Sequence, residues 1–122
     1  MNLIKNNVEL QENSFLYKLH ESSEFSIDML EKITGEIVEL VKRSVDLSDL
    51  DIILYSQALF FIYKMATTNI IYHFNPNDLY RVNDLDKDYQ LYLDRFSFSL
   101  EMFLKRDYES INDYVDELGS LV

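Results

Sequence analysis

Hydrophobic residues recur at intervals of three and four over most of the chain, a spacing that predicts amphipathic helices. One helix is expected to begin near Ser26, and the cations Lys42 and Arg43 fall in its last turn, where they favour the negative end of a helix dipole. Another is expected over residues 84–105, and a short last helix over 108–118. The predicted inward stripe of the first of these helices is Ile27, Leu30, Ile33, Ile37 and Val41. That of the helix at 84–105 is Leu85, Tyr89, Tyr92, Phe96, Leu100 and Phe103. The helix at 108–118 has the inward residues Ile111, Val115 and Leu118.

The segment between these stripes predicts the longest and most apolar helix. Ser48 is a suitable N-cap, with an acidic residue three positions later as in a capping box. Pro76 disfavours helix in the residue before it, so the helix should end near residue 74. Its polar positions Gln57, Lys64 and Thr68 form only a narrow line. A helix that is apolar on most sides is expected to be enclosed, so we place residues 48–73 at the centre of the fold.

The remaining pattern is weaker. Ser14 is a candidate N-cap for a short apolar cluster that follows it, whereas residues 1–13 have no clear period and leave an N-terminal arm open. Residues 96–100 alternate as a strand would, but their helical flanks favour helix. Two glycines and one proline are too few turn-formers for a multi-stranded sheet. The sequence therefore predicts one all-α domain over residues 1–122, a compact bundle of four to five helices around the helix at 48–73.

Charge narrows the classes of partner. Twenty-two acidic residues oppose eleven basic ones in 122 residues, a formal net charge of −11. Such a charge repels nucleic acid and anionic membrane and attracts basic proteins. The chain has no cysteine and no basic N-terminal start leading into an apolar stretch. Polar residues also interrupt its most apolar segment, 52–74. We therefore expect a soluble cytoplasmic protein that binds neither nucleic acid nor membrane.

The acidic residues at 84, 86 and 88 are spaced like the first ligands of a calcium loop. The next ligand-loop position should be glycine and is Tyr89, and the closing glutamate is replaced by Arg95. This rejects an EF-hand. Three interpretations of the cluster stay open: a solvated helix start, an acidic patch that binds a partner, or a specific metal site. We expect no cofactor and no metal.

A catalytic interpretation has little support. His20 and His73 are the only histidines, and neither belongs to a Glu-x-x-His pair. The glycines at 35 and 119 stand alone, so the chain lacks a glycine-rich phosphate loop, and it has no nucleophile elbow. We therefore expect that the protein is not an enzyme.

Carboxylates and tyrosines gather in the C-terminal part of the chain. Half-buried tyrosine with its hydroxyl at the surface is one interpretation; the other is that tyrosines anchor a partner that the carboxylates attract. On the second interpretation, the predicted partner-binding residues are Asp84, Asp86, Asp88, Asp94, Asp107, Tyr108, Glu109, Asp113, Asp116 and Glu117.

The segment Ser14-Phe15-Leu16-Tyr17-Lys18-Leu19-His20-Glu21, followed by Ser22-Ser23-Glu24-Phe25 and an acidic amphipathic helix, resembles the N-terminal part of small immunity proteins from bacterial contact-dependent inhibition and polymorphic toxin systems. The resemblance implies a cytoplasmic antidote without enzymatic activity. Its partner would be the C-terminal toxin domain of a delivered effector, often a nuclease, whose active site it would block.

Electrostatics agrees with such a role, because a nuclease cleft is basic and an acidic surface can occupy the same field. Two alternatives remain open. One is an acidic mimic of nucleic acid that inhibits a DNA- or RNA-binding protein. The other is a helical regulatory subunit that oligomerises through an apolar face, so a homodimer is also open.

Overall fold

The fold is all-α over the part of the chain that the structure, a computed structural model, describes: residues 2–106 and 118. Its helices are α1 (Asn2–Val8), α2 (Phe15–Glu21), α3 (Ile27–Lys42), the 3₁₀ turn η1 (Ser44–Asp46), α4 (Asp49–Phe74) and α5 (Tyr89–Lys105). The described residues contain no strand, only a single bridge between Glu24 and Asn83. The predicted bundle is confirmed.

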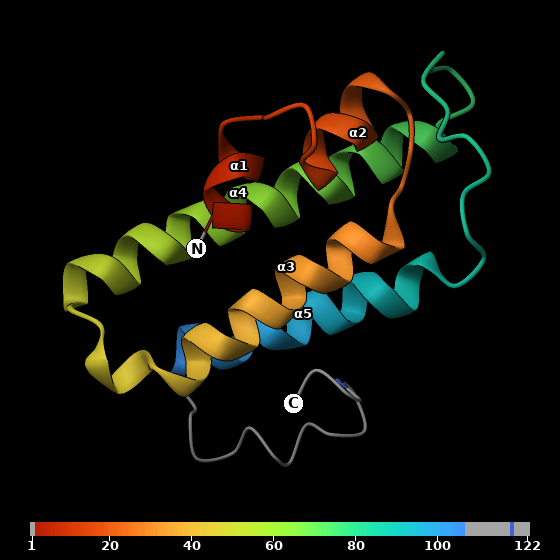
Figure 1. Cartoon of the computed structure of the whole chain (residues 1–122). Coiled ribbons are helices and arrows are strands. Elements are labelled where there is room, and N and C mark those ends of the chain that lie inside the picture. Colours follow the sequence, from red (N-terminus) through yellow and green to blue (C-terminus); the bar gives the residue numbers. More distant parts are fainter. Residues whose placement is uncertain (1, 107–117, 119–122) are drawn as a thin grey trace.

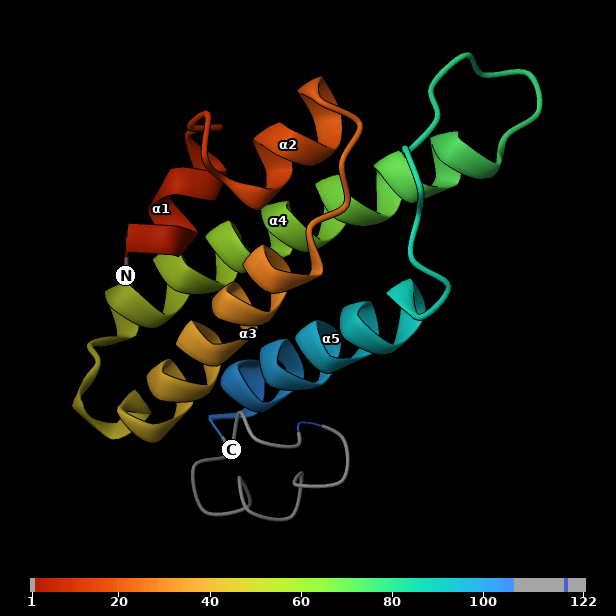
Figure 2. The same ribbon diagram turned by 45° about the vertical axis from the view of Figure 1, so that its right-hand side comes forward.

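The three long helices lie side by side (Figures 1 and 2). The first and third of them, α3 and α5, run in the same direction and pack closely, whereas α4 runs the opposite way. The short helices α1 and α2 lie across α4. The core between them is built largely from buried aliphatic residues and from Phe15, Phe96 and Phe103.

Serine side chains begin three of the helices at the predicted positions. The hydroxyl oxygens of Ser14, Ser26 and Ser48 accept hydrogen bonds from backbone N–H groups in the first turns of α2, α3 and α4, at 3.1, 3.3 and 3.1 Å. Each bond satisfies a backbone donor that the helix itself leaves unpaired. These boundaries follow from local chemistry, which explains why the sequence predicted them.

The N-terminal arm that the sequence left open is instead a helix, α1, packed on the bundle. Ile4 is 2% exposed and belongs to the core. The buried side chain of Asn7 donates to the carbonyl of Leu3 at 2.7 Å and accepts from the N–H of Leu16 at 2.9 Å, which joins α1 to α2. A seven-residue helix is too short to display a period, so this contact is visible only in the tertiary structure.

The helix expected over 84–105 begins five residues later, at Tyr89. Asp84 has φ +46°, a left-handed conformation that an α-helix excludes. The side chain of Asp86 accepts from the N–H of Asp88 at 2.7 Å and so holds an Asx turn in place of a first helical turn. The alternating segment 96–100 is helical, as predicted.

The helix predicted at the centre, α4, is not enclosed. Its buried residues, Leu59, Ile62, Ala66, Asn69 and Ile70, cover only one side. Phe60, which belongs to the apolar surface that was expected to be enclosed, is 61% exposed. The helix is covered by α1, α2 and part of α5, and no described element covers its other side. An apolar surface on most sides of a helix allows burial on any of them. Which sides are buried is decided by the position of the neighbouring helices.

The last predicted helix, 108–118, lies outside the described residues, apart from Leu118. That residue is fully buried and its carbonyl accepts a hydrogen bond from Arg95 of α5. Position 118 is therefore buried beside α5, and Leu118 is one of the predicted inward positions.

Candidate functional site

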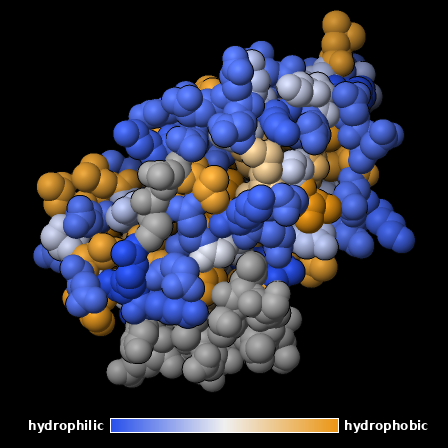
Figure 3. All heavy atoms as spheres, viewed as in Figure 1, coloured by the Kyte–Doolittle hydropathy of each residue, from blue (hydrophilic) through white to orange (hydrophobic). Residues whose placement is uncertain are grey.

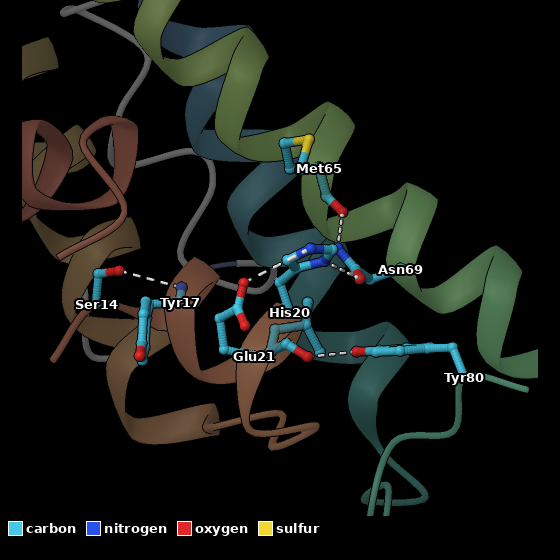
Figure 4. Close-up of polar contacts among 8 residues, drawn as sticks. Ser14, Tyr17, His20, Glu21, Met65, Asn69 and Tyr80 are labelled. Atoms are coloured by element: carbon cyan, nitrogen blue, oxygen red, sulfur yellow. Dashed lines mark hydrogen bonds and ion pairs between the residues drawn. The ribbon is translucent and has the colours of Figure 1, made fainter. Parts of the chain in front are cut away.

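The connection between α4 and α5, residues 75–88, carries three of the predicted site residues and is held to the rest of the fold. The N–H of Val82 donates to Nδ1 of His73 at 2.8 Å, and the N–H of Asn83 donates to the carbonyl of Ser23 at 2.7 Å. The hydroxyl of Tyr80 donates to the carbonyl of Leu19 in α2 (Figure 4). We call this segment the acidic loop.

Further bonds stabilise the acidic loop from within. Side-chain oxygens of Asn75 and Asp78 accept from backbone N–H groups two residues later, at 3.0 and 2.8 Å. The guanidinium of Arg81 donates to the carbonyls of Asp78 and Tyr80, each at 2.6 Å. These Asx turns and the arginine bonds satisfy backbone groups that lack a helix or sheet partner. The loop therefore has a defined conformation.

Four of the ten predicted site residues are described, and all four are exposed: Asp84, Asp86 and Asp88 in the acidic loop, and Asp94 on α5. Within the described residues, none of them forms an ion pair. We call these four residues the acidic surface. The other six, Asp107, Tyr108, Glu109, Asp113, Asp116 and Glu117, lie outside the described residues.

A groove of about 370 Å³ between α4 and α5 adjoins this surface. Its lining combines the aromatic rings of Tyr63 and Tyr89 with the apolar Ile71 and Leu93 and the carboxylate of Asp94. The ring of Tyr89 also packs 6.3 Å from Phe25, between centroids. The groove thus offers apolar and aromatic contact area beside the exposed carboxylate of Asp94.

The sequence left open whether the tyrosines are half-buried structural residues or anchors for a partner, and the described tyrosines include both kinds. Burial raises the pKa of the Tyr80 hydroxyl, which holds the loop to α2 and is structural. Tyr92 is half-buried beneath the guanidinium of Arg95, 5.9 Å from its ring centroid. Tyr72 is exposed at the end of α4. Of the described tyrosines in this region, Tyr63 and Tyr89 in the groove and the exposed Tyr72 are placed to contact a partner.

Within the described residues, the polar side-chain contacts of His20 are with Asn69 and Glu21, and that of His73 is with the acidic loop. Nδ1 of His20 lies 3.3 Å from Oδ1 of Asn69, whose amide donates to the carbonyl of Met65 (Figure 4). His73 serves as a hydrogen-bond acceptor for the acidic loop. Among residues 2–106 and 118, no three acidic or histidine side chains are grouped so that they could hold a metal ion.

A second candidate surface was missed by sequence reasoning: the side of α4 that no described element covers. It carries the line Gln57, Lys64 and Thr68, and exposed apolar side chains on both sides of that line. Hydrophobic atoms gather where α4 begins, at the left-hand edge of Figure 3. The signal was in the sequence, as apolar residues on nearly all sides of one helix, but it was interpreted as central burial.

Comparison of the chain with protein-family models, curated protein sequences and solved structures found no significant match to any of them. The similarity to immunity proteins therefore stays a prediction from residues 14–25. A search of the described helices found none that is both long and apolar enough to cross a membrane.

Proposed function

We propose that this chain is an immunity protein, an antidote without catalysis that binds a cognate toxin domain and covers its active site with the acidic surface. The observation that carries the proposal is the set of four exposed carboxylates without an ion pair among the described residues, three on a loop held by hydrogen bonds and one on the adjoining α5. The proposed partner is basic, and a nuclease is the expected case.

The physical argument has two parts. A nuclease cleft carries positive charge because it holds phosphates, so exposed carboxylates accelerate encounter and compete for the same groups. The groove with Tyr63 and Tyr89 supplies apolar contact area that water leaves on binding, which slows dissociation. Neither part requires a catalytic group, a cofactor or a metal. The proposed location is the cytoplasm, where a delivered toxin would act.

The direct test is protection. Cells that are induced to make the toxic C-terminal domain encoded beside this gene are expected to survive when this chain is co-expressed, and the two proteins are expected to co-purify. Rescue should be specific, so an unrelated toxin domain serves as the control. Failure to rescue, together with failure to co-purify, would exclude the antidote function.

A charge-reversal pair tests the surface itself. The double variant Asp84→Lys with Asp94→Lys should lower the association rate for the toxin domain by at least about tenfold at low salt, because it replaces attraction by repulsion. The matched control, Glu12→Lys with Glu21→Lys, makes the same change in net charge at exposed positions outside the acidic surface. Equal rates for both variants would exclude the acidic surface as the binding site.

A further inference from the structure

The outer face of α4 is apolar and large enough to be an interface. Six of its large hydrophobic side chains are between 43% and 65% exposed: Leu50, Ile53, Phe60, Ile71, Tyr72 and Phe74. Together they leave roughly 700 Å² uncovered, taking about 200 Å² for a fully exposed large side chain. This exceeds the largest patch of a typical monomer and approaches the area that each partner buries in a standard interface.

Charge distinguishes this face from the rest of the chain. Residues 52–74 contain no aspartate or glutamate, although the chain as a whole carries a formal charge of −11. The one fully cationic side chain there is that of Lys64, at the middle of the face. A basic partner gains no charge attraction from such a surface, so the outer face of α4 suits a different partner. Because Ile71 and Thr67 also line the groove beside the acidic surface, the two partners would compete at that end of the face.

The spacing on the outer face follows a heptad repeat. Leu50, Gln57, Lys64 and Ile71 are seven residues apart, and a second set, three residues after each of them, comprises Ile53, Phe60, Thr67 and Phe74. Together these are the two seam positions of a coiled coil. Seven of the eight side chains are exposed, and that of Thr67 is half-buried. The seam is therefore present on α4, but no described helix of the chain occupies it.

We propose that a second copy of this chain occupies the seam in an antiparallel homodimer. The two-fold axis crosses the seam at the level of residue 62 along α4. An antiparallel coiled coil places each position of one set against one of the other set. This register pairs positions whose numbers add to 124, and each pair is alike or complementary. The four layers are Leu50 with Phe74, Ile53 with Ile71, Gln57 with Thr67, and Phe60 with Lys64, each residue paired with one of the other copy.

The pattern also disfavours a parallel arrangement. A parallel dimer would place the two Lys64 ammonium groups in the same layer, and it would bring the acidic first turns at Asp49 and Asp51 together. In the antiparallel register, each Lys64 lies over a Phe60 ring, where a cation is attracted. Two such contacts form, one on each side of the axis, as an isologous interface requires.

Sedimentation equilibrium on the full chain tests the association. We expect the mass to rise from 14.5 kDa toward twice that value with concentration. The dimer should strengthen with added salt, because salt screens repulsion between two acidic chains, whereas toxin binding should weaken. Phe60→Glu should raise the dimer dissociation constant at least tenfold, and Leu91→Glu, at an exposed position on α5, should leave it unchanged. A chain that stays monomeric at all concentrations would overturn the proposal.

Cysteine crosslinking tests the register, since the natural chain has no cysteine. The double variant Ile53→Cys with Ile71→Cys should form covalent dimers on mild oxidation. Ile53→Cys alone should not, because its two copies would lie about 27 Å apart along the seam, far beyond disulfide reach. Dimers from the single variant would overturn the antiparallel register. So would a double variant that crosslinks no faster than Leu91→Cys with Leu104→Cys, two exposed positions on α5.

Discussion

The two long helices α3 and α4 are both capped by serine and both rich in apolar residues, but they differ in how much of that surface they bury. On α3 the apolar residues form one stripe, and seven residues of the helix are buried. On α4, which is ten residues longer, five are buried and one side is left uncovered. A one-sided stripe thus predicts which side of a helix is buried, whereas an all-round apolar surface predicts only that burial will occur somewhere.

The largest expected difference in the free energy of unfolding is between truncation of a buried phenylalanine and truncation of one on the uncovered side of α4. Phe96→Ala removes a fully buried ring that stacks near Tyr63 and should lower the free energy of unfolding by about 3–5 kcal/mol. Phe60→Ala, on the outer face of α4, should change it by no more than about 0.5 kcal/mol in dilute, monomeric protein. Urea unfolding measures both. Equal losses would show that the outer face of α4 is buried within the monomer.

A smaller effect is expected where the short helices attach to the bundle. Asn7→Ala leaves the carbonyl of Leu3 and the N–H of Leu16 without their side-chain partner, and it should cost about 1–3 kcal/mol. The same measurement on Asn6→Ala, one position earlier in α1, is the control and should show a change within about 0.5 kcal/mol. If the two variants unfold alike, the amide of Asn7 does not hold α1 to α2.

The smallest expected effect is a change of stability with pH, which comes from the partly buried carboxyl of Glu36 on α3. The described part of α4 has no buried carboxylate, so no such effect is expected there. Burial raises the pKa of Glu36 above its usual value, so the folded state favours the protonated carboxyl. Stability from this group is present at acidic pH and is lost as pH rises from about 4.5 through the folded pKa. Relative to the natural chain, Glu36→Gln should therefore unfold at a temperature that is similar at pH 4 and a few degrees higher at pH 7.

Thermal unfolding at several pH values follows this difference. The exposed Glu39 is the control: Glu39→Gln loses only a surface pair with Lys42, at 3.2 Å, and should not gain stability as pH rises. If Glu36→Gln instead becomes less stable than the natural chain as the pH rises from 4 to 7, the fold stabilises the ionised form of Glu36. Glu31, whose pKa is also raised by burial and partly lowered by Arg95, should follow the same sign.

Much of the fold could be predicted where local chemistry decides it. Serine caps begin α2, α3 and α4 at the expected residues, and the stripe of α3 is buried as its period indicates. The late start of α5 could not be predicted, because it follows from the left-handed Asp84 and from a bond between Asn83 and Ser23, which are 60 residues apart. The exposure of the four described acidic residues could be inferred from charge, but the hydrogen bonds that hold the loop carrying three of them could not.

The sequence by itself determined which segments become helices, where three of them begin, and that the chain is strongly acidic, because caps, periodicity and charge are local or summed properties. The tertiary structure alone decided that α1 packs on the bundle through Asn7, that the acidic loop is tied to α2 through Tyr80, and that one side of α4 stays uncovered. The reason is geometric. Which side of an apolar helix meets a neighbour depends on where chain-distant helices lie, and that information is in no single segment.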